Sequence, residues 1–148
     1  MTTASTADSG RIRTAARSRS LLRGTAAGAA VATFVNAALW VGGRAADVSF
    51  SVSPPVGDAM NEVGIVLVVV TTLLMFAAGS GLLALAVRRS RQWVRTVLVA
   101  AAVFAVASAG GPLTTADDTA TAVLLAAMHL ATGAVFLVTA SRVTSGAR

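Results

Sequence analysis

Clusters of arginine alternate with four long apolar runs along this chain of 148 residues. All twelve basic residues are arginines, and all except Arg44 lie before the first run, between the second and third, or after the fourth. All six acids except Asp8 lie in or beside the other two connections. Clustered basic residues mark the cytoplasmic side of a membrane. The pattern therefore predicts a chain that crosses a membrane four times, with both termini in the cytoplasm.

The composition fits a membrane solvent better than water. Hydrophobic residues make up 55% of the chain, charged residues 12%, and the mean hydropathy is +0.77, which is too apolar for a soluble domain of this length. The sequence pI near 11.9 raises nucleic-acid binding as an alternative. No nucleic-acid partner is expected, however, because the arginines flank apolar runs and aromatic residues make up only 5%. The chain has no cysteine, which excludes disulfides, thiolate metal sites and thiol redox chemistry.

Four runs are long enough to span a bilayer, at residues 24–41, 63–87, 94–110 and 120–140. A spanning helix needs about 20 mostly apolar residues, because the hydrocarbon core is about 30 Å thick. Lipid offers no partner for backbone amides, so each run is expected to be helical. The predicted fold is an all-α membrane protein, an up-down bundle of four transmembrane helices at residues 21–142. A disordered basic tail at 1–20 and a short tail at 143–148 are both expected in the cytoplasm.

The arginines also set the orientation of the predicted bundle. The topology determinants are Arg11, Arg13, Arg17, Arg19, Arg23, Arg88, Arg89, Arg91 and Arg95. A cleaved signal peptide is the alternative for the first run, but its apolar stretch is longer than the usual length of about 7–15 residues. We therefore expect a retained anchor and a multi-pass protein of the plasma membrane, in contact with the lipid bilayer.

The connection at residues 42–61 is the longest one predicted to lie outside. Its residues 48–53 alternate apolar and serine side chains, and Pro54 and Pro55 follow as a stop. We expect a short strand on the outer mouth of the bundle, with Val48, Phe50 and Val52 facing inward. Covering the helix ends is the preferred role; a lid over a ligand pocket is the alternative.

Helix ends account for half of the acids. Asp58 precedes the second run, and Asp117 and Asp118 precede the fourth, where carboxylates cap helix N-termini and oppose the positive end of the helix dipole. The Gly-Gly-Pro triplet at 110–112 is expected to end the third helix and turn the chain.

Helix association in lipid depends on close backbone approach and on polar contacts between helices. Small residues recur four apart at Gly24, Gly28 and Ala32, at Ala77 and Gly81, at Ala101, Ala105 and Ala109, and at Ala122 and Ala126. The spacing predicts a tight bundle without specifying which helix pairs are in contact.

Two polar side chains form the candidate interhelical polar or ligand site. His129 is the only histidine and the only ionisable residue well inside a predicted span, and Asn36 lies at about the same depth of the first span. An unpaired polar group in hydrocarbon costs roughly several kcal/mol, so we expect a hydrogen bond between these two side chains. A proton relay or a ligand contact is the alternative role for His129. A structural role is favoured because no carboxylate accompanies this histidine.

No constellation for catalysis or cofactor binding is visible. Catalytic zinc needs three protein ligands, a serine hydrolase needs a base with an orienting acid, and a haem between helices usually needs two axial histidines. With one histidine in the chain, we expect no enzyme activity, no metal site and no cofactor.

The residues around these polar groups carry a family resemblance. Asn36, the triplet Gly111-Pro112-Leu113, and Met128-His129-Leu130 followed by Gly133 resemble a family of small four-helix integral membrane proteins from high-GC actinobacteria. That family is a domain of unknown function, and the resemblance covers residues 21–142. It implies the fold and a membrane location, and it supplies no activity.

Two functional hypotheses follow from the sequence. The first is a non-enzymatic structural or accessory component of the plasma membrane, with a second copy or another membrane protein as partner. The alternative is a minimal transporter or a binder of a small apolar molecule, with its site between helices near His129 and Asn36.

Overall fold

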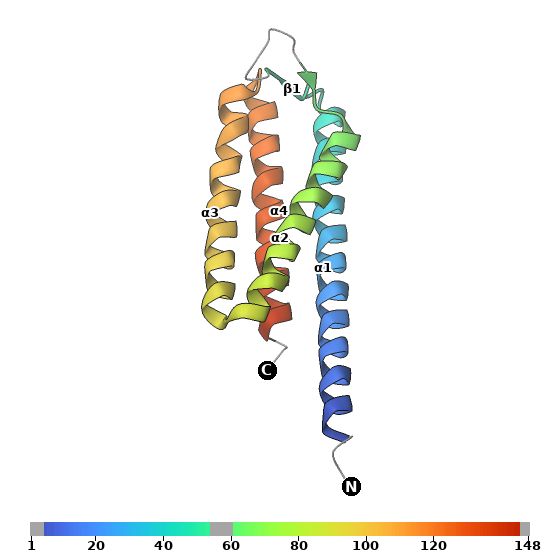
Figure 1. The fold of residues 1–148 in the computed structure, drawn as a ribbon. Coiled ribbons are helices and arrows are strands. Elements are labelled where there is room, and N and C mark those ends of the chain that lie inside the picture. The colour runs from blue at the N-terminus through green and yellow to red at the C-terminus, as the bar shows by residue number, and fades with distance from the viewer. Residues whose placement is uncertain (1–4, 54–60, 146–148) are drawn as a thin grey trace.

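Four long helices and a short hairpin make up the computed structural model of this chain (Figure 1). It describes residues 5–53 and 61–145, with side chains at residue 19 and from residue 22 onward. The elements are α1 (Ser5–Ala45), β1 (Ser51–Val52), β2 (Asn61–Glu62), α2 (Ile65–Arg89), α3 (Arg91–Thr115) and α4 (Thr119–Ser145). Consecutive helices run antiparallel, and β1 and β2 lie at one end of the bundle, here called the hairpin end (Figure 1). The opposite end, called the turn end, carries Ser90 between α2 and α3.

The prediction of four apolar helices is confirmed. The stretches that are long and apolar enough to cross a membrane are Leu22–Ala45, Ile65–Arg89, Arg91–Thr115 and Thr119–Ser145, with 24, 25, 25 and 27 residues. Three of them are longer than the predicted apolar runs because helical hydrogen bonding continues into the flanking residues, whereas Ile65–Arg89 has the same length as the predicted run at 63–87. Each added residue contributes one backbone hydrogen bond once a helix has started.

Two predicted breaks are absent. The disordered tail predicted at residues 1–20 is wrong from Ser5 onward, where α1 begins; residues 1–4 lie outside the described part. This segment is rich in Ala and Arg, both good helix formers, and contains no proline. The predicted end of the third helix at 110–112 is also wrong, because α3 continues to Thr115 with Pro112 buried inside it. Proline so near the C-terminus removes one backbone bond, and the carbonyl of Pro112 still accepts from the amide of Ala116 at 3.0 Å.

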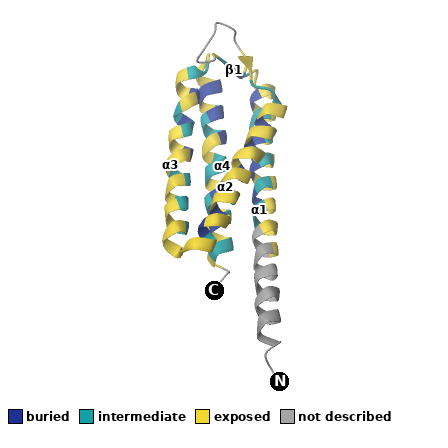
Figure 2. Cartoon of the chain, in the orientation of Figure 1, coloured by how far each residue is buried: buried dark blue, intermediate teal, exposed yellow. Residues whose placement is uncertain are grey.

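The core has two parts, both lined by α4. One is an aromatic cluster in which Phe76 of α2 meets Phe136 of α4 edge to face, with ring centroids 5.5 Å apart. The other lies near the hairpin end and contains Phe50, Val68, Leu125 and Met128. In Figure 2, buried positions lie mainly on the sides of the helices that face one another, while exposed positions cover the outside of the bundle. Helix α4 packs most extensively, mainly against α1 and α3 and also against α2, so it is the central packing element.

Small residues allow close approach on some helices and not on others. A Cβ added at Gly28 of α1 would lie 2.5 Å from Thr139 Oγ1 and 2.7 Å from Phe76 Cζ. Gly133 of α4 lies directly against Ala105 of α3. Gly81 of α2, by contrast, is exposed and has open space around it, so the small-residue pattern of α2 does not mark a contact within the chain.

Candidate functional site

A polar contact joins three helices in the interior of the bundle. Asn36 of α1 is 3% exposed, and its side-chain nitrogen donates to the hydroxyl oxygens of Thr72 in α2 at 2.9 Å and Thr132 in α4 at 2.8 Å. We call Asn36, Thr72 and Thr132 the interhelical node. It uses both N–H groups of one amide to connect α1 with its two neighbours.

The threonines determine which way the amide faces. Thr72 donates its hydroxyl proton to the carbonyl of Val68 at 2.7 Å, and Thr132 donates to the carbonyl of Met128 at 2.9 Å. Both hydroxyls therefore present only lone pairs to Asn36, and only the NH₂ group can satisfy them. The carbonyl oxygen of Asn36 points elsewhere and has no hydrogen-bond partner among the described residues. The hydroxyl oxygen of Thr33, three residues earlier on α1, is also buried without a described partner.

His129 does not take part in this node. Its side chain is exposed on α4, and its ring Nδ1 lies 2.7 Å from the carbonyl oxygen of Leu125 in the same helix. Because a carbonyl only accepts, Nδ1 carries the proton. The predicted hydrogen bond between Asn36 and His129 is therefore wrong. The inward face of α4 is set by Leu125, Met128 and Phe136, and at about 100° per residue His129 lies beside this face.

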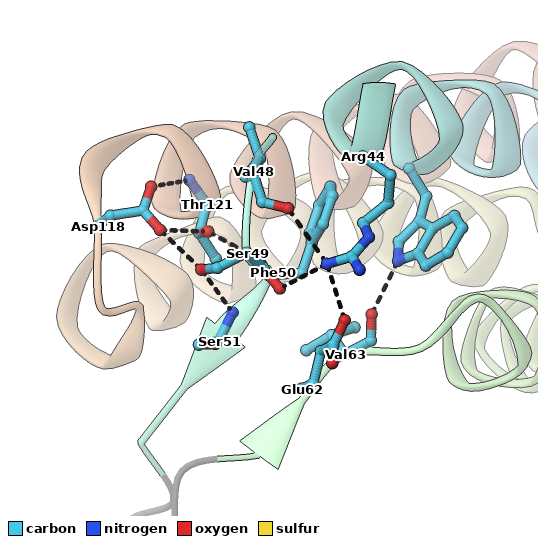
Figure 3. Close-up of polar contacts among 10 residues, drawn as sticks. Arg44, Val48, Ser49, Phe50, Ser51, Glu62, Val63, Asp118 and Thr121 are labelled. Carbon is cyan, nitrogen blue, oxygen red and sulfur yellow. Dashed lines mark hydrogen bonds and ion pairs between the residues drawn. The ribbon is translucent and has the colours of Figure 1, made fainter. Parts of the chain in front are cut away.

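The hairpin end is closed by a second group of contacts, shown in Figure 3. We call this group the hairpin cap; it consists of Trp40, Arg44, Ser49, Phe50, Glu62, Val63, Asp118 and Thr121. Strands β1 and β2 pair antiparallel, with Ser51 opposite Glu62 and Val52 opposite Asn61. The cap joins this hairpin to the ends of α1 and α4.

Phe50 is the centre of the cap. Its side chain is fully buried and stacks against Trp40 of α1, with ring centroids 6.0 Å apart. Its amide donates to Thr121 Oγ1 at 3.1 Å, and its carbonyl accepts from the amide of Val63 at 2.9 Å. The φ angle of Phe50 is 54°, an unfavourable value for an aromatic residue, which these contacts hold in place.

Asp118 connects the cap to the start of α4. Its carboxylate accepts from the amide of Thr121 at 2.8 Å, from the hydroxyl of Thr121 at 2.7 Å and from the hydroxyl of Ser49 at 3.0 Å. The hydrogen bond from the Thr121 amide is the largest cause that lowers the pKa of Asp118 below its ordinary value, followed by the bond from the Thr121 hydroxyl. Asp118 thus occupies the N-cap position of α4.

The other predicted caps differ. Asp117 is exposed, and its backbone amide donates to the carbonyl of Ser51 at 3.1 Å. Helix α2 begins after Gly64 with no side-chain cap, so Asp58, which lies outside the described residues, is not its N-cap residue.

Arg44 of α1 makes the one ion pair found in residues 5–53 and 61–145, to Glu62 of β2 at 2.8 Å. The same guanidinium donates to the carbonyl of Ser49 at 3.2 Å. Both side chains of the pair are well exposed, so the pair contributes no more than about 1 kcal/mol. Its main effect is to hold β2 against the end of α1.

The predicted topology arginines whose side chains are described are all exposed: Arg19, Arg23, Arg88, Arg89, Arg91 and Arg95. The last four lie at the turn end, in or beside the connection from α2 to α3. The side chains of Arg11, Arg13 and Arg17 lie outside the described part of the chain.

Sequence reasoning identified Asn36 but missed its partners. Thr72 and Thr132 each donate to a carbonyl of their own helix, and a threonine hydroxyl bonded in this way still accepts a further hydrogen bond. In the described residues, no group of three or more His, Asp or Glu side chains is arranged to hold a metal ion.

Four apolar helices of membrane-spanning length, three of them joined through a buried polar node, define the class of a small helical membrane-type bundle. Residues 16–146 match DUF6069, a family of unknown function, and the chain belongs to that family. Neither a curated protein nor a solved structure matches the chain.

Proposed function

We propose that this chain is a multi-pass plasma-membrane protein of actinobacteria that acts as a non-enzymatic structural or accessory component. Both termini lie in the cytoplasm and the hairpin end faces outward. The orientation is supported by the charge distribution, since Arg88, Arg89, Arg91 and Arg95 gather at the turn end. The hairpin end carries Glu62, Asp117 and Asp118.

The observation that carries the non-enzymatic role is that the polar groups of the interhelical node and of the hairpin cap hold the fold together. Helices α1, α2 and α4 are joined by the NH₂ group of Asn36, which donates to the hydroxyls of Thr72 and Thr132. Each of these hydroxyls donates in turn to a carbonyl of its own helix. At the hairpin end, the carboxylate of Asp118 caps α4 and accepts a hydrogen bond from Ser49. Because these groups form hydrogen bonds within the bundle, a partner protein would bind to the apolar outer faces of the helices.

Native mass spectrometry of the protein extracted gently from membranes tests this role. We expect the chain as a homo-oligomer or in complex with another membrane protein, without a stoichiometric small molecule other than lipid. A monomer that carries one such small molecule per chain would contradict the proposal.

A second candidate function is supported by one observation, the buried carbonyl oxygen of Asn36 and the buried hydroxyl of Thr33 without described partners. A largely apolar molecule with two hydrogen-bond donors, entering between the helices, would satisfy both oxygens. In that case native mass spectrometry would detect a ligand that Asn36→Leu removes. His129→Leu is the matched control and would retain it, because His129 is exposed and forms no hydrogen bond with the node.

A further inference from the structure

A shallow, open groove lies along the exposed face of α3, starting at the turn end, and α3 alone supplies the residues that line it. It has a volume of about 690 Å³ and is polar at one end, where Gln92, Arg95 and Thr96 line it. Farther along the helix its lining becomes apolar, with Val99, Val103 and Phe104 beside the small residue Ala100. These positions recur three and four residues apart, so they share one face of α3.

The length of the apolar part matches one leaflet of a bilayer. From Val99 to Ala107, the last residue of the lining, α3 rises about 12 Å. One leaflet contributes about half of a hydrocarbon core that is about 30 Å thick. The polar end of the groove therefore lies at headgroup depth when the apolar part lies among acyl chains.

Unpaired positive charge surrounds the polar end. Arg91 and Arg95 are four residues apart on α3 and so lie on one face of it, and Arg88 and Arg89 precede them at the end of α2. All four are exposed, and none of them forms an ion pair with a carboxylate in the described part of the chain. The groove thus combines an apolar helix face with a cluster of positive charge at one end.

We propose that this groove is a binding site for one anionic glycerophospholipid of the cytoplasmic leaflet. The lipid phosphate lies at Arg95 and Arg91, and one acyl chain lies along Val99, Val103 and Phe104 over Ala100. The inference rests on the membrane orientation proposed above. Charge favours this occupant over a second copy of the chain, because a parallel copy on the same face would bring the two Arg95 side chains together at equal depth.

The test measures lipid retention by the full-length protein. Protein in neutral detergent is titrated with phosphatidylglycerol or with phosphatidylcholine of the same acyl chains, and bound lipid is counted by native mass spectrometry. We expect phosphatidylglycerol to bind more tightly by at least about fivefold, the order expected for one arginine near an anionic headgroup. Arg95→Gln should remove most of this preference, and Ala100→Phe should reduce binding of both lipids by filling the groove.

Two matched variants control for general effects of charge and bulk. Arg142→Gln removes an exposed arginine of α4, and Ala78→Phe adds the same ring to an exposed position of α2. Both should bind lipid as the unaltered protein does, and helix content by circular dichroism should be equal in all four variants.

Four results would overturn the proposal. The first is equal retention of the two lipids; the second is unchanged binding by Arg95→Gln. The third is competition by glycerol phosphate without acyl chains at the same concentration as the lipid, which would indicate a simple anion site. A change in oligomer mass caused by Ala100→Phe, without a change in lipid binding, would assign the groove to a second copy instead. These results are independent of whether the protein acts as a structural component or binds a ligand at the interhelical node.

Discussion

The side-chain nitrogen of Asn36 in α1 lies 2.8 Å from the hydroxyl oxygen of Thr132 in α4. The same nitrogen bonds to Thr72 in α2, so one amide connects three helices. In lipid, burying apolar side chains gives little net drive for helix association, and such polar contacts acquire more weight. The node should therefore make a measurable contribution to stability.

A double-mutant cycle of Asn36→Ala and Thr132→Val tests the node. The two substitutions should show a coupling free energy of about 0.6 kcal/mol, and no more than about 1.7 kcal/mol, the range measured for polar contacts between membrane helices. The measurement is the free energy of unfolding in mixed detergent micelles. The cycle of Asn36→Ala with His129→Ala is the control and should be additive. Additive effects in the Asn36 and Thr132 cycle would contradict the assigned hydrogen bond.

Gly28 and Gly42 give a matched pair for the packing of α1. Gly28→Ala should lower the free energy of unfolding by about 1–3 kcal/mol, because the new methyl group meets Thr139 and Phe76. Gly42→Ala should be neutral or mildly stabilising, since nothing lies within 4 Å of the added atom. Thermal unfolding in detergent compares the two variants. Equal losses of stability would show that α1 does not pack against α2 and α4 at Gly28.

His129→Leu should change the free energy of unfolding by less than about 0.5 kcal/mol. The reason is that His129 is exposed on α4 and bonds only to a carbonyl of its own helix, which remains bonded within the helix. A loss of unfolding free energy several times larger than this, measured in the same micelles, would mean that the imidazole has a partner in another helix.

The lowered pKa of Asp118 predicts that the folded protein loses stability in acid. Its pKa is lowered in the folded protein by the hydrogen bonds from Thr121 and Ser49, so the unfolded chain takes up its proton first as the pH falls. The stabilisation by Asp118 is therefore complete above its ordinary pKa near 3.8 and is lost as the pH falls through the lower folded value. Asp118→Asn should be less stable than the unaltered protein at pH 6, and the difference should shrink toward pH 3. A difference that is constant across this range would exclude the carboxylate as the stabilising group.

The four helices could be predicted from the sequence because length and hydropathy decide whether a segment can satisfy its backbone in lipid. The residues at which the helices begin and end could not be predicted in the same way. The propensity of Ala and Arg carries α1 back to Ser5, and Pro112 fits within the last turns of α3, where a missing amide costs one hydrogen bond. Both errors arose from treating polar or helix-breaking residues as boundaries.

The depth of Asn36 could also be predicted, but its partners could not. Depth depends on counting residues along a helix, whereas contact depends on the rotation of each helix about its axis. The alternation at residues 48–53 indicated an inward Phe50, but the structure pairs only Ser51 and Val52 as a strand. The positive φ angle of Phe50, which the burial of its ring holds in place, has no signature in the sequence.

Site-directed labelling tests the central claim, a four-span chain with its hairpin end outside. The chain has no cysteine, so single variants at two exposed positions, Asp117→Cys at the hairpin end and Gln92→Cys at the turn end, give clean signals. In intact cells, a membrane-impermeant maleimide should label Asp117→Cys and should label Gln92→Cys only after the membrane is opened. Labelling of both variants in intact cells, or of Gln92→Cys alone, would contradict the account.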